Sequence, residues 1–89
     1  MGTTGVWKIE RGSESDRSVL RLSGRIQGEH LAELVSFLRA ESNGQPLVLD
    51  LAGVKLVDHQ VVLFLADRQS AGVKLRNCPA YIREWITRL

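Results

Sequence analysis

Four polar residues that could do chemistry fall near the ends of predicted strands: Asp50, Asp58, His59 and Gln60. Ligands of open α/β sheets bind beyond the carboxyl ends of the strands, so this placement favours a binding or catalytic loop. The plainer interpretation is that Asp58 caps a helix and His59 lies in an exposed turn. The chain has no Gly-x-Ser-x-Gly elbow and no Ser/His/Asp arrangement in a recognisable context. We therefore expect no enzymatic activity and no catalytic residues.

Patterns that bind metals or cofactors are missing from the sequence. His30, His59 and Cys78 are scattered, and none of them has a partner at the close spacing of a zinc site. No phosphate-binding loop occurs, and the segment from Gly24 to Gly28 lacks the dinucleotide pattern. We expect no metal and no cofactor, with His30 solvated in the first turn of a helix. Cys78 is either a small buried apolar residue or a thiol activated by a helix N-terminus.

Composition places the chain among ordinary globular domains. Its 89 residues include 12 Lys and Arg against 10 Asp and Glu, a net charge of +2, and 44% are hydrophobic. This length fits one domain, and two excess charges make no surface for nucleic acid. A single cysteine favours a reducing compartment. The longest apolar run, Val61–Ala66, is far shorter than the roughly 20 residues of a membrane span, and the N-terminus lacks a signal-peptide pattern. We expect one cytoplasmic domain over residues 1–89, without membrane insertion.

Hydrophobic periodicity predicts alternating strands and helices. Apolar residues alternate in the first two strands, which the turn-rich segment 11–16 connects. Leu31, Leu34 and Leu38 share one face of a helix that Asn43-Gly44 ends. The predicted elements are strands 6–10 and 19–22, a helix from residue 29, a strand at 47–51, a turn and a second extended piece at 52–57, a helix at 61–69, a strand at 73–76 and a helix after Pro79.

The order β-β-α-β-α-β-α predicts an α/β fold. Two strand–helix–strand units imply right-handed crossovers and parallel pairing, so we expect a mixed, mostly parallel four-stranded sheet layered with helices. Asp58 is the expected N-cap of the second long helix, and Gly72 the residue that ends it. Asn77 is the expected N-cap of the last helix.

The run Val61–Ala66 is apolar on every side of its helix, so either a neighbouring helix or a partner covers its outer side. For Tyr81 and Trp85, at helical spacing in the last helix, packing onto the sheet and a partner-binding face are both open. Self-association through the apolar helix and Trp85 is a further possibility, which predicts a homodimer.

Two segments resemble the STAS domain family, named after sulphate transporters and anti-sigma-factor antagonists: Leu47-Val-Leu-Asp-Leu-Ala-Gly-Val-Lys-Leu-Val-Asp58 and, after an apolar helix, Ala71-Gly-Val-Lys-Leu75. Upstream, Leu22-Ser-Gly-Arg-Ile26 resembles the family's Leu-x-Gly-Glu-Leu turn. The C-terminal segment, Asn77-Cys-Pro-Ala-Tyr-Ile-Arg-Glu-Trp-Ile86, resembles the ending of small stand-alone bacterial members. The resemblance covers nearly the whole chain and implies the same element order.

The resemblance implies a non-enzymatic protein-binding module. In stand-alone members the domain captures an anti-sigma kinase, and phosphorylation of the first Ser after the residue matching Asp58 switches binding off. Here His59 occupies that phosphoacceptor position, Gln60 the next Ser and Val61 the Gly, so no hydroxyl remains in the loop. We therefore expect constitutive binding without a serine phosphoswitch.

The expected contact surface combines this loop, the outer side of the following helix and the first turn, where Arg25 and Gln27 replace the acidic residues of many antagonists. Its predicted residues are Asp58, His59, Gln60, Val61, Val62, Leu65, Arg25, Ile26 and Gln27. Two partner classes stay open: a kinase-like anti-sigma factor, and the ATPase of an ATP-binding cassette transporter. A third hypothesis is a small-ligand sensor at the Asp58 loop.

Overall fold

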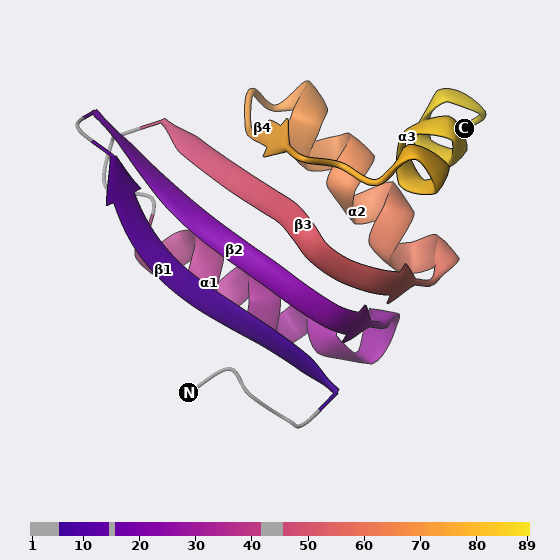
Figure 1. Cartoon of the computed structure of the whole chain (residues 1–89), viewed down its shortest axis with the longest axis horizontal. Helices are drawn as coiled ribbons and strands as arrows, with labels where there is room; N and C mark the ends of the chain where they lie inside the picture. Colours follow the sequence, from indigo (N-terminus) through magenta and orange to yellow (C-terminus); the bar gives the residue numbers. More distant parts are fainter. Residues whose placement is uncertain (1–5, 15, 42–45) are drawn as a thin grey trace.

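A four-stranded mixed sheet forms the centre of the molecule (Figure 1). The computed structural model describes residues 6–14, 16–41 and 46–89. The strands β1 (Trp7–Glu14), β2 (Arg17–Ile26), β3 (Leu47–Val57) and β4 (Lys74–Arg76) lie side by side in chain order. β1 is antiparallel to β2, whereas β3 and β4 continue the sheet in parallel. The predicted α/β class and element order are thus confirmed.

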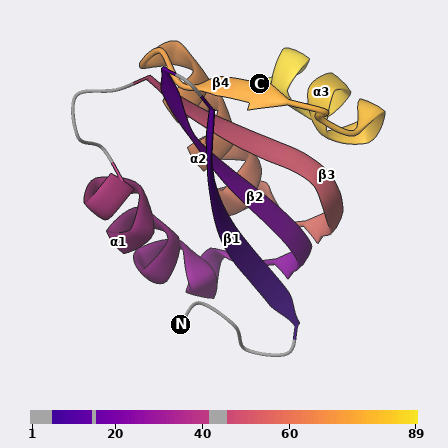
Figure 2. The ribbon, with the colours of Figure 1, turned by 60° about the vertical axis from the view of Figure 1, so that its left-hand side comes forward.

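The connections between parallel strands carry the two longer helices. A short 3-10 helix, η1 (Gly28–His30), leads into α1 (Leu31–Glu41), α2 (His59–Ser70) joins β3 to β4, and α3 (Ala80–Thr87) ends the chain. The crossover from β2 to β3 and the crossover from β3 to β4 both lead to the next strand on the same side. Because both connections are right-handed, α1 and α2 lie on the same face of the sheet. An ion pair of 2.8 Å joins Arg11 on β1 to Glu41 at the end of α1. Figure 2 shows α1 on the β1 side of the sheet and α3 beyond the end of β4.

The core lies between the sheet and its helices. Alternate positions of β2 and β3 point to this layer, α1 contributes Leu34 and Leu38, and α3 contributes Ile82, which is 0% exposed. The remaining buried members of the cluster are Trp7, Leu20, Leu22, Ile26, Leu49, Leu51, Val54, Val57, Val61, Val62 and Leu65. Because α3 inserts a fully buried side chain, it belongs to the packed domain.

The first hairpin is longer than the sequence indicated. Segment 11–16 is not a free connection, since β1 continues to Glu14 and pairs there with Arg17. At this end of β1, the Arg76 guanidinium on β4 donates to both carboxylate oxygens of Glu14, at 2.7 and 3.1 Å. The ion pair lowers the pKa of the Glu14 carboxyl. A strand at the other edge of the sheet therefore holds a segment that looks like a loop in the sequence.

The segment 52–57, predicted as a turn and a second extended piece, is extended as predicted but without the separate turn, because β3 runs without interruption from Leu47 to Val57. The residues that suggested a turn instead form an irregularity in the pairing of β3 with β2. Arg21 pairs with Asp50, but the next pair is Ser23 with Gly53, so β3 has one extra residue here. The N–H of Ala52 donates to Asp50 Oδ1 at 3.0 Å, which bends the backbone at this point. A Cβ on Gly53 would lie 2.7 Å from the Cβ of Ser23, so the bulge requires glycine.

The ends of α2 follow the sequence signals closely. Asp58 is its N-cap and accepts the N–H of Val61 at 3.0 Å, as predicted. At the other end Gly72 has φ +103°, the left-handed conformation expected of the residue that ends a helix. The helix starts at His59, two residues before the predicted start, because the cap itself sits at position 58.

The start of α3 differs from the prediction. Asn77 is not its N-cap: it adopts φ 55°, and its side-chain N–H group donates to Asp50 Oδ1 at 3.3 Å. Pro79 occupies the N-cap position instead. The reason is tertiary, since Asp50 on β3 offers Asn77 a partner that cannot be read from local spacing. The predicted helix stop at Asn43-Gly44 lies outside the described residues.

A conservative substitution tests whether α3 is part of the cooperative core. Ile82→Val removes one methylene from a fully buried side chain and should lower the free energy of unfolding by about 0.5–1.5 kcal/mol. The matched control is Leu89→Val at an exposed leucine, expected to change it by less than about 0.5 kcal/mol. Both are measured by urea unfolding, and equal effects of the two substitutions would show that α3 is not packed as described.

Candidate partner-binding surface

The start of α2 is tied to the turn after β2 by one carboxylate. Asp58 Oδ1 accepts the N–H of Val61 at 3.0 Å, and Asp58 Oδ2 accepts the N–H of Gly28 at 2.8 Å. The first contact caps α2, and the second crosses from β3 to the first residue of η1. One hydrogen bond, from the Gly28 N–H to Asp58, therefore joins the two predicted halves of the site, the Asp58 loop and the first turn.

These contacts stabilise the charged form of Asp58. The pKa of its carboxyl lies below the ordinary value of 3.8, chiefly because the Gly28 N–H donates to it. Partial burial opposes this shift, and the N–H groups of Val61 and Gln60 add to it. A carboxylate whose oxygens already accept backbone N–H groups is a poor general base, so its position favours a structural role for Asp58.

His30 contacts the same turn and is buried there, so the expectation that it is solvated is wrong. Its side chain is buried and stacks on Trp7, with ring centroids 5.5 Å apart. The N–H of Gln27 donates to His30 Nδ1 at 3.0 Å, so Nδ1 carries no proton. The sequence signal was misleading because Trp7, which covers His30, belongs to β1 and is distant in the chain.

His59 and Gln60 are exposed, and each contacts a different part of the fold. The His59 ring faces Trp85 of α3 at 6.0 Å between centroids. The Gln60 side chain lies so close to Gly28 that a Cβ there would overlap its amide oxygen. The exposed His59 and Gln60 are therefore positioned by α3 and by the first turn, and remain accessible for contact.

Four predicted contact residues are buried in the folded domain, contrary to the exposed position that the prediction gave them. Val61, Val62 and Leu65 of α2 are all 1% exposed or less, and Ile26 is 1% exposed. They form the side of α2 and the end of β2 that close the core, where the sheet and Ile82 cover them. Their apolar character reflects burial within the domain, which answers the question of what covers most of this apolar helix.

The apolar residues that are exposed at this end are different ones. Leu63 is 45% exposed on the outer side of α2, and Leu56, paired with Arg25 across β3 and β2, is 51% exposed. Helical periodicity could have predicted the exposure of Leu63. It lies one turn after His59, on the side of α2 opposite to the one that holds Val62 and Leu65. Tyr81 borders the region and donates its hydroxyl hydrogen to the carbonyl oxygen of Lys55 at 2.9 Å.

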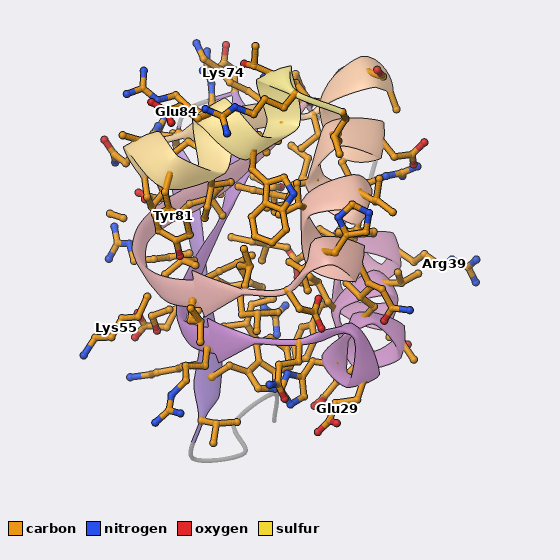
Figure 3. The ribbon with its side chains drawn as sticks, turned by 90° about the vertical axis from the view of Figure 1, so that its right-hand side faces the viewer. Glu29, Arg39, Lys55, Lys74, Tyr81 and Glu84 are labelled. Carbon is orange, nitrogen blue, oxygen red and sulfur yellow. The ribbon has the colours of Figure 1, made fainter. Side chains whose placement is uncertain are left out.

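We define the α2-start surface as the exposed residues of this region: Arg25, Gln27, Leu56, His59, Gln60 and Leu63. Figure 3 looks onto this end of the molecule, with Tyr81 and Lys55 at one side and Glu29 at the base. Arg25 and Leu56 alternate with the buried Ile26 and Val57, so they point to the sheet face opposite the helices, whereas His59, Gln60 and Leu63 lie on α2. The α2-start surface therefore runs around the ends of β2 and β3, with one exposed leucine on each side and polar residues between them, a composition that suits a protein contact.

Asp50 does not join this cluster, so the four-residue polar group seen in the sequence is not formed. The side chain is buried, accepts from Ala52 and Asn77, and lies 3.8 Å from the Arg21 guanidinium. β3 continues for seven residues beyond Asp50, to Val57, before Asp58 begins the loop. The strand is longer than its apolar run suggested, which moves Asp50 away from the strand end.

Cys78 fits the interpretation as a small apolar residue better than the interpretation as an activated thiol. It is half-buried after β4, and burial raises the pKa of its thiol. A raised pKa leaves the thiol protonated at neutral pH, which disfavours nucleophilic reactivity.

No helix within residues 6–14, 16–41 and 46–89 is long and apolar enough to span a membrane. The family model described as "Mlab, STAS domain" matches residues 9–88 of the chain. No curated protein matches the sequence.

Substitutions at Asp58 separate its two hydrogen bonds. Asp58→Asn keeps an oxygen for the helix cap but loses the bond from Gly28, so the free energy of unfolding should fall by about 1 kcal/mol. Asp58→Ala removes both bonds and should cost about 2 kcal/mol. Asp67→Asn, at an exposed aspartate later in α2, is the control with an expected change below about 0.5 kcal/mol. Equal losses for Asn and control would contradict the contact with Gly28.

The contribution of Asp58 should also depend on pH. Because the folded pKa is lower than the unfolded one, the stabilisation is complete above about pH 3.8 and is lost as the pH falls through the folded pKa. The stability difference between the wild type and Asp58→Asn should therefore be constant near neutrality and shrink in acid. Urea unfolding of both proteins across this range measures it, and a difference that persists below the folded pKa would contradict the assignment.

Proposed function

Because this chain belongs to the STAS domain family, we propose that it is a non-enzymatic regulatory subunit that binds a protein partner constitutively through the α2-start surface. The observation that carries this proposal is the exposed His59 at the first position of α2, where a phosphorylation-switched STAS module needs a hydroxyl. The next hydroxyl along α2 is Ser70, at its opposite end. A partner is therefore bound or released according to protein levels, without a serine phosphate at this loop.

The physical logic of the missing switch is electrostatic. A phosphoryl group at this point would add roughly two negative charges beside the carboxylate of Asp58 and the N-terminus of α2. His59 offers an imidazole in its place, held against Trp85 at 6.0 Å between ring centroids. The Asp58 carboxylate beside it already accepts the N–H groups of Gly28 and Val61, and its lowered pKa keeps it charged at neutral pH.

Preorganisation supports binding as the task of this surface. The loop that precedes α2 is fixed to η1 by the Asp58 contact, and η1 is in turn held by the bond from Gln27 N to His30 Nδ1. A surface that is ordered before contact loses less conformational entropy on binding. Leu56 and Leu63 then supply exposed apolar area that no described element of the chain covers completely.

Two partner classes follow from this proposal. The first is a kinase-like anti-sigma factor, for which the domain acts as an antagonist that phosphorylation of its own loop does not release. The second is the ATPase of an ATP-binding cassette transporter, for which the domain is an accessory subunit, and a permanent contact without a hydroxyl switch suits this role. A small-ligand sensor at Asp58 is less favoured, because four concave pockets of the described chain are lined by other residues.

A substitution at Leu63 tests the surface. The tagged wild-type protein is expressed in its native cells, captured, and its co-purifying proteins are quantified by mass spectrometry. Leu63→Glu should reduce the recovered partner by about tenfold or more, because a charge replaces an exposed apolar contact. Leu89→Glu, at the exposed leucine that ends the chain, is the matched control and should leave recovery unchanged. Thermal unfolding confirms that both variants are folded.

The identity of the captured protein then separates the classes. A kinase-like anti-sigma factor assigns the antagonist role, and a transport ATPase assigns the accessory-subunit role. Capture of only further copies of this chain, or equal recovery with Leu63→Glu and the wild type, would contradict the proposal.

A further inference from the structure

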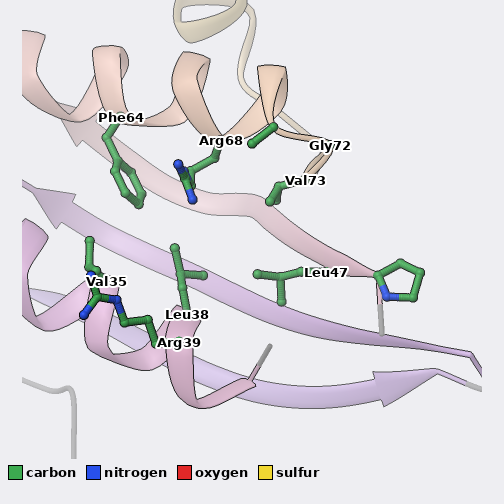
Figure 4. A pocket seen from close by; sticks show the side chains of 10 residues that line it. Val35, Leu38, Arg39, Leu47, Phe64, Arg68, Gly72 and Val73 are labelled. Carbon is green, nitrogen blue, oxygen red and sulfur yellow. The ribbon is translucent and has the colours of Figure 1, made fainter. Parts of the chain in front are cut away.

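A groove separates α1 from the second half of α2, away from the α2-start surface (Figure 4). Its volume is about 460 Å³, and it opens beside the first residues of β3. Its lining consists of Val35, Leu38, Arg39, Pro46, Leu47, Phe64, Arg68, Ala71, Gly72 and Val73. The groove is thus lined by the last turns of α1 and α2, the start of β3 and the residues that precede β4.

The floor of the groove is apolar and incompletely buried. Leu47, Phe64 and Val73 pack against the core on one side, yet each keeps part of its surface exposed, as does Val35 on α1. In Figure 4 Phe64 projects from α2 toward α1, and Leu38 and Val35 face it from below. Half-exposed apolar side chains from three elements therefore surround one concave space, where a bound apolar group would be shielded from water.

Two guanidinium groups reach the same groove from opposite helices. Arg68 of α2 lies over the ring of Phe64, 5.8 Å from its centroid, and pairs with the exposed Asp67 at 2.6 Å. Arg39 of α1 forms no ion pair within the described residues. None of the described lining residues is acidic, and the undescribed segment 42–45 contains no Asp or Glu in its sequence. The groove therefore combines an apolar floor with the Arg39 guanidinium, which has no ion pair within the described residues, and with Arg68, whose Nε and Nη2 groups donate to Asp67 and whose Nη1 group remains for a ligand.

We propose that this groove is a binding site for a small organic anion with one apolar chain, such as a medium-length alkyl carboxylate. Its chain lies on Phe64, Leu47 and Val73, and its carboxylate accepts hydrogen bonds from Arg39 and Arg68. Planar guanidinium groups match carboxylate oxygens, and the contact of Arg68 with Phe64 holds that cation in place before binding.

The dimensions favour a small molecule over a segment of a partner protein. A volume near 460 Å³ falls within the range of about 300–1,000 Å³ that is usual for ligand pockets. A docked helix needs a groove that follows its apolar residues over several turns. Here α1 lines the site only from Val35 to Arg39. The proposal does not depend on the partner proposed above, because α2 supplies different residues to the two sites.

Titration of the 89-residue protein with decanoate tests the inference. Amide ¹H–¹⁵N shifts should change saturably at the residues that line the groove, and decanol, which has the same chain length without the charge, should bind at least about tenfold more weakly. The double substitution R39Q/R68Q should weaken decanoate binding by about tenfold or more. The matched control R83Q/R88Q removes one arginine of α3 and the arginine that caps its C-terminus, and should leave the dissociation constant unchanged.

Each outcome of these titrations either supports or overturns the proposed site. Saturable shifts in the groove that depend on Arg39 and Arg68 support the site, whether or not a protein partner is found. Shifts confined to the α2-start surface, equal binding of decanoate and decanol, or an unchanged constant in R39Q/R68Q overturn it. Binding of an acidic peptide at the groove without binding of decanoate overturns it as well, in favour of a protein-contact surface. Thermal unfolding of each variant shows that loss of binding is not loss of structure.

Discussion

The carboxylate of Asp58 joins two segments that are thirty residues apart, since it accepts the N–H of Gly28 with one oxygen and caps α2 through Val61 with the other. Each of these donors belongs to a helix start whose N–H groups have no partner within the helix. One side chain therefore satisfies orphan donors of η1 and α2 together. The relative position of the first turn and α2 depends on this contact, and so does the surface that they present.

Helix α2 serves three purposes that its amphipathic geometry keeps apart. One side, with Val61, Val62 and Leu65, closes the core against the sheet. Its first turn exposes His59 and Gln60 beside the tied loop, and its second half forms a wall of the groove with Phe64 and Arg68. This division explains why the helix looks apolar all round in the sequence, although the apolar residues face three different surroundings.

The errors of the sequence interpretation have a common origin in contacts between distant segments. His30 appears solvated until Trp7 of β1 stacks on it, and Asn77 appears to be a helix cap until Asp50 of β3 takes its side chain. Ile26 and the buried residues of α2 appear available to a partner because the sequence does not show which side of an element meets the sheet. Leu63 was overlooked for the same reason, although helical periodicity separates it from its buried neighbours.

The element order, the α/β class, the capping role of Asp58 and the end of α2 at Gly72 could be predicted from the sequence, because they depend on periodicity and on backbone preferences that act within a few residues. The sequence also shows that no hydroxyl stands at His59 or Gln60. Which apolar residues are exposed, how far β1 and β3 extend, and which side chains share the α2-start surface became known only from the folded chain. Those outcomes depend on strand pairing and on hydrogen bonds such as that from Gly28 to Asp58, whose partners become neighbours only when the chain folds.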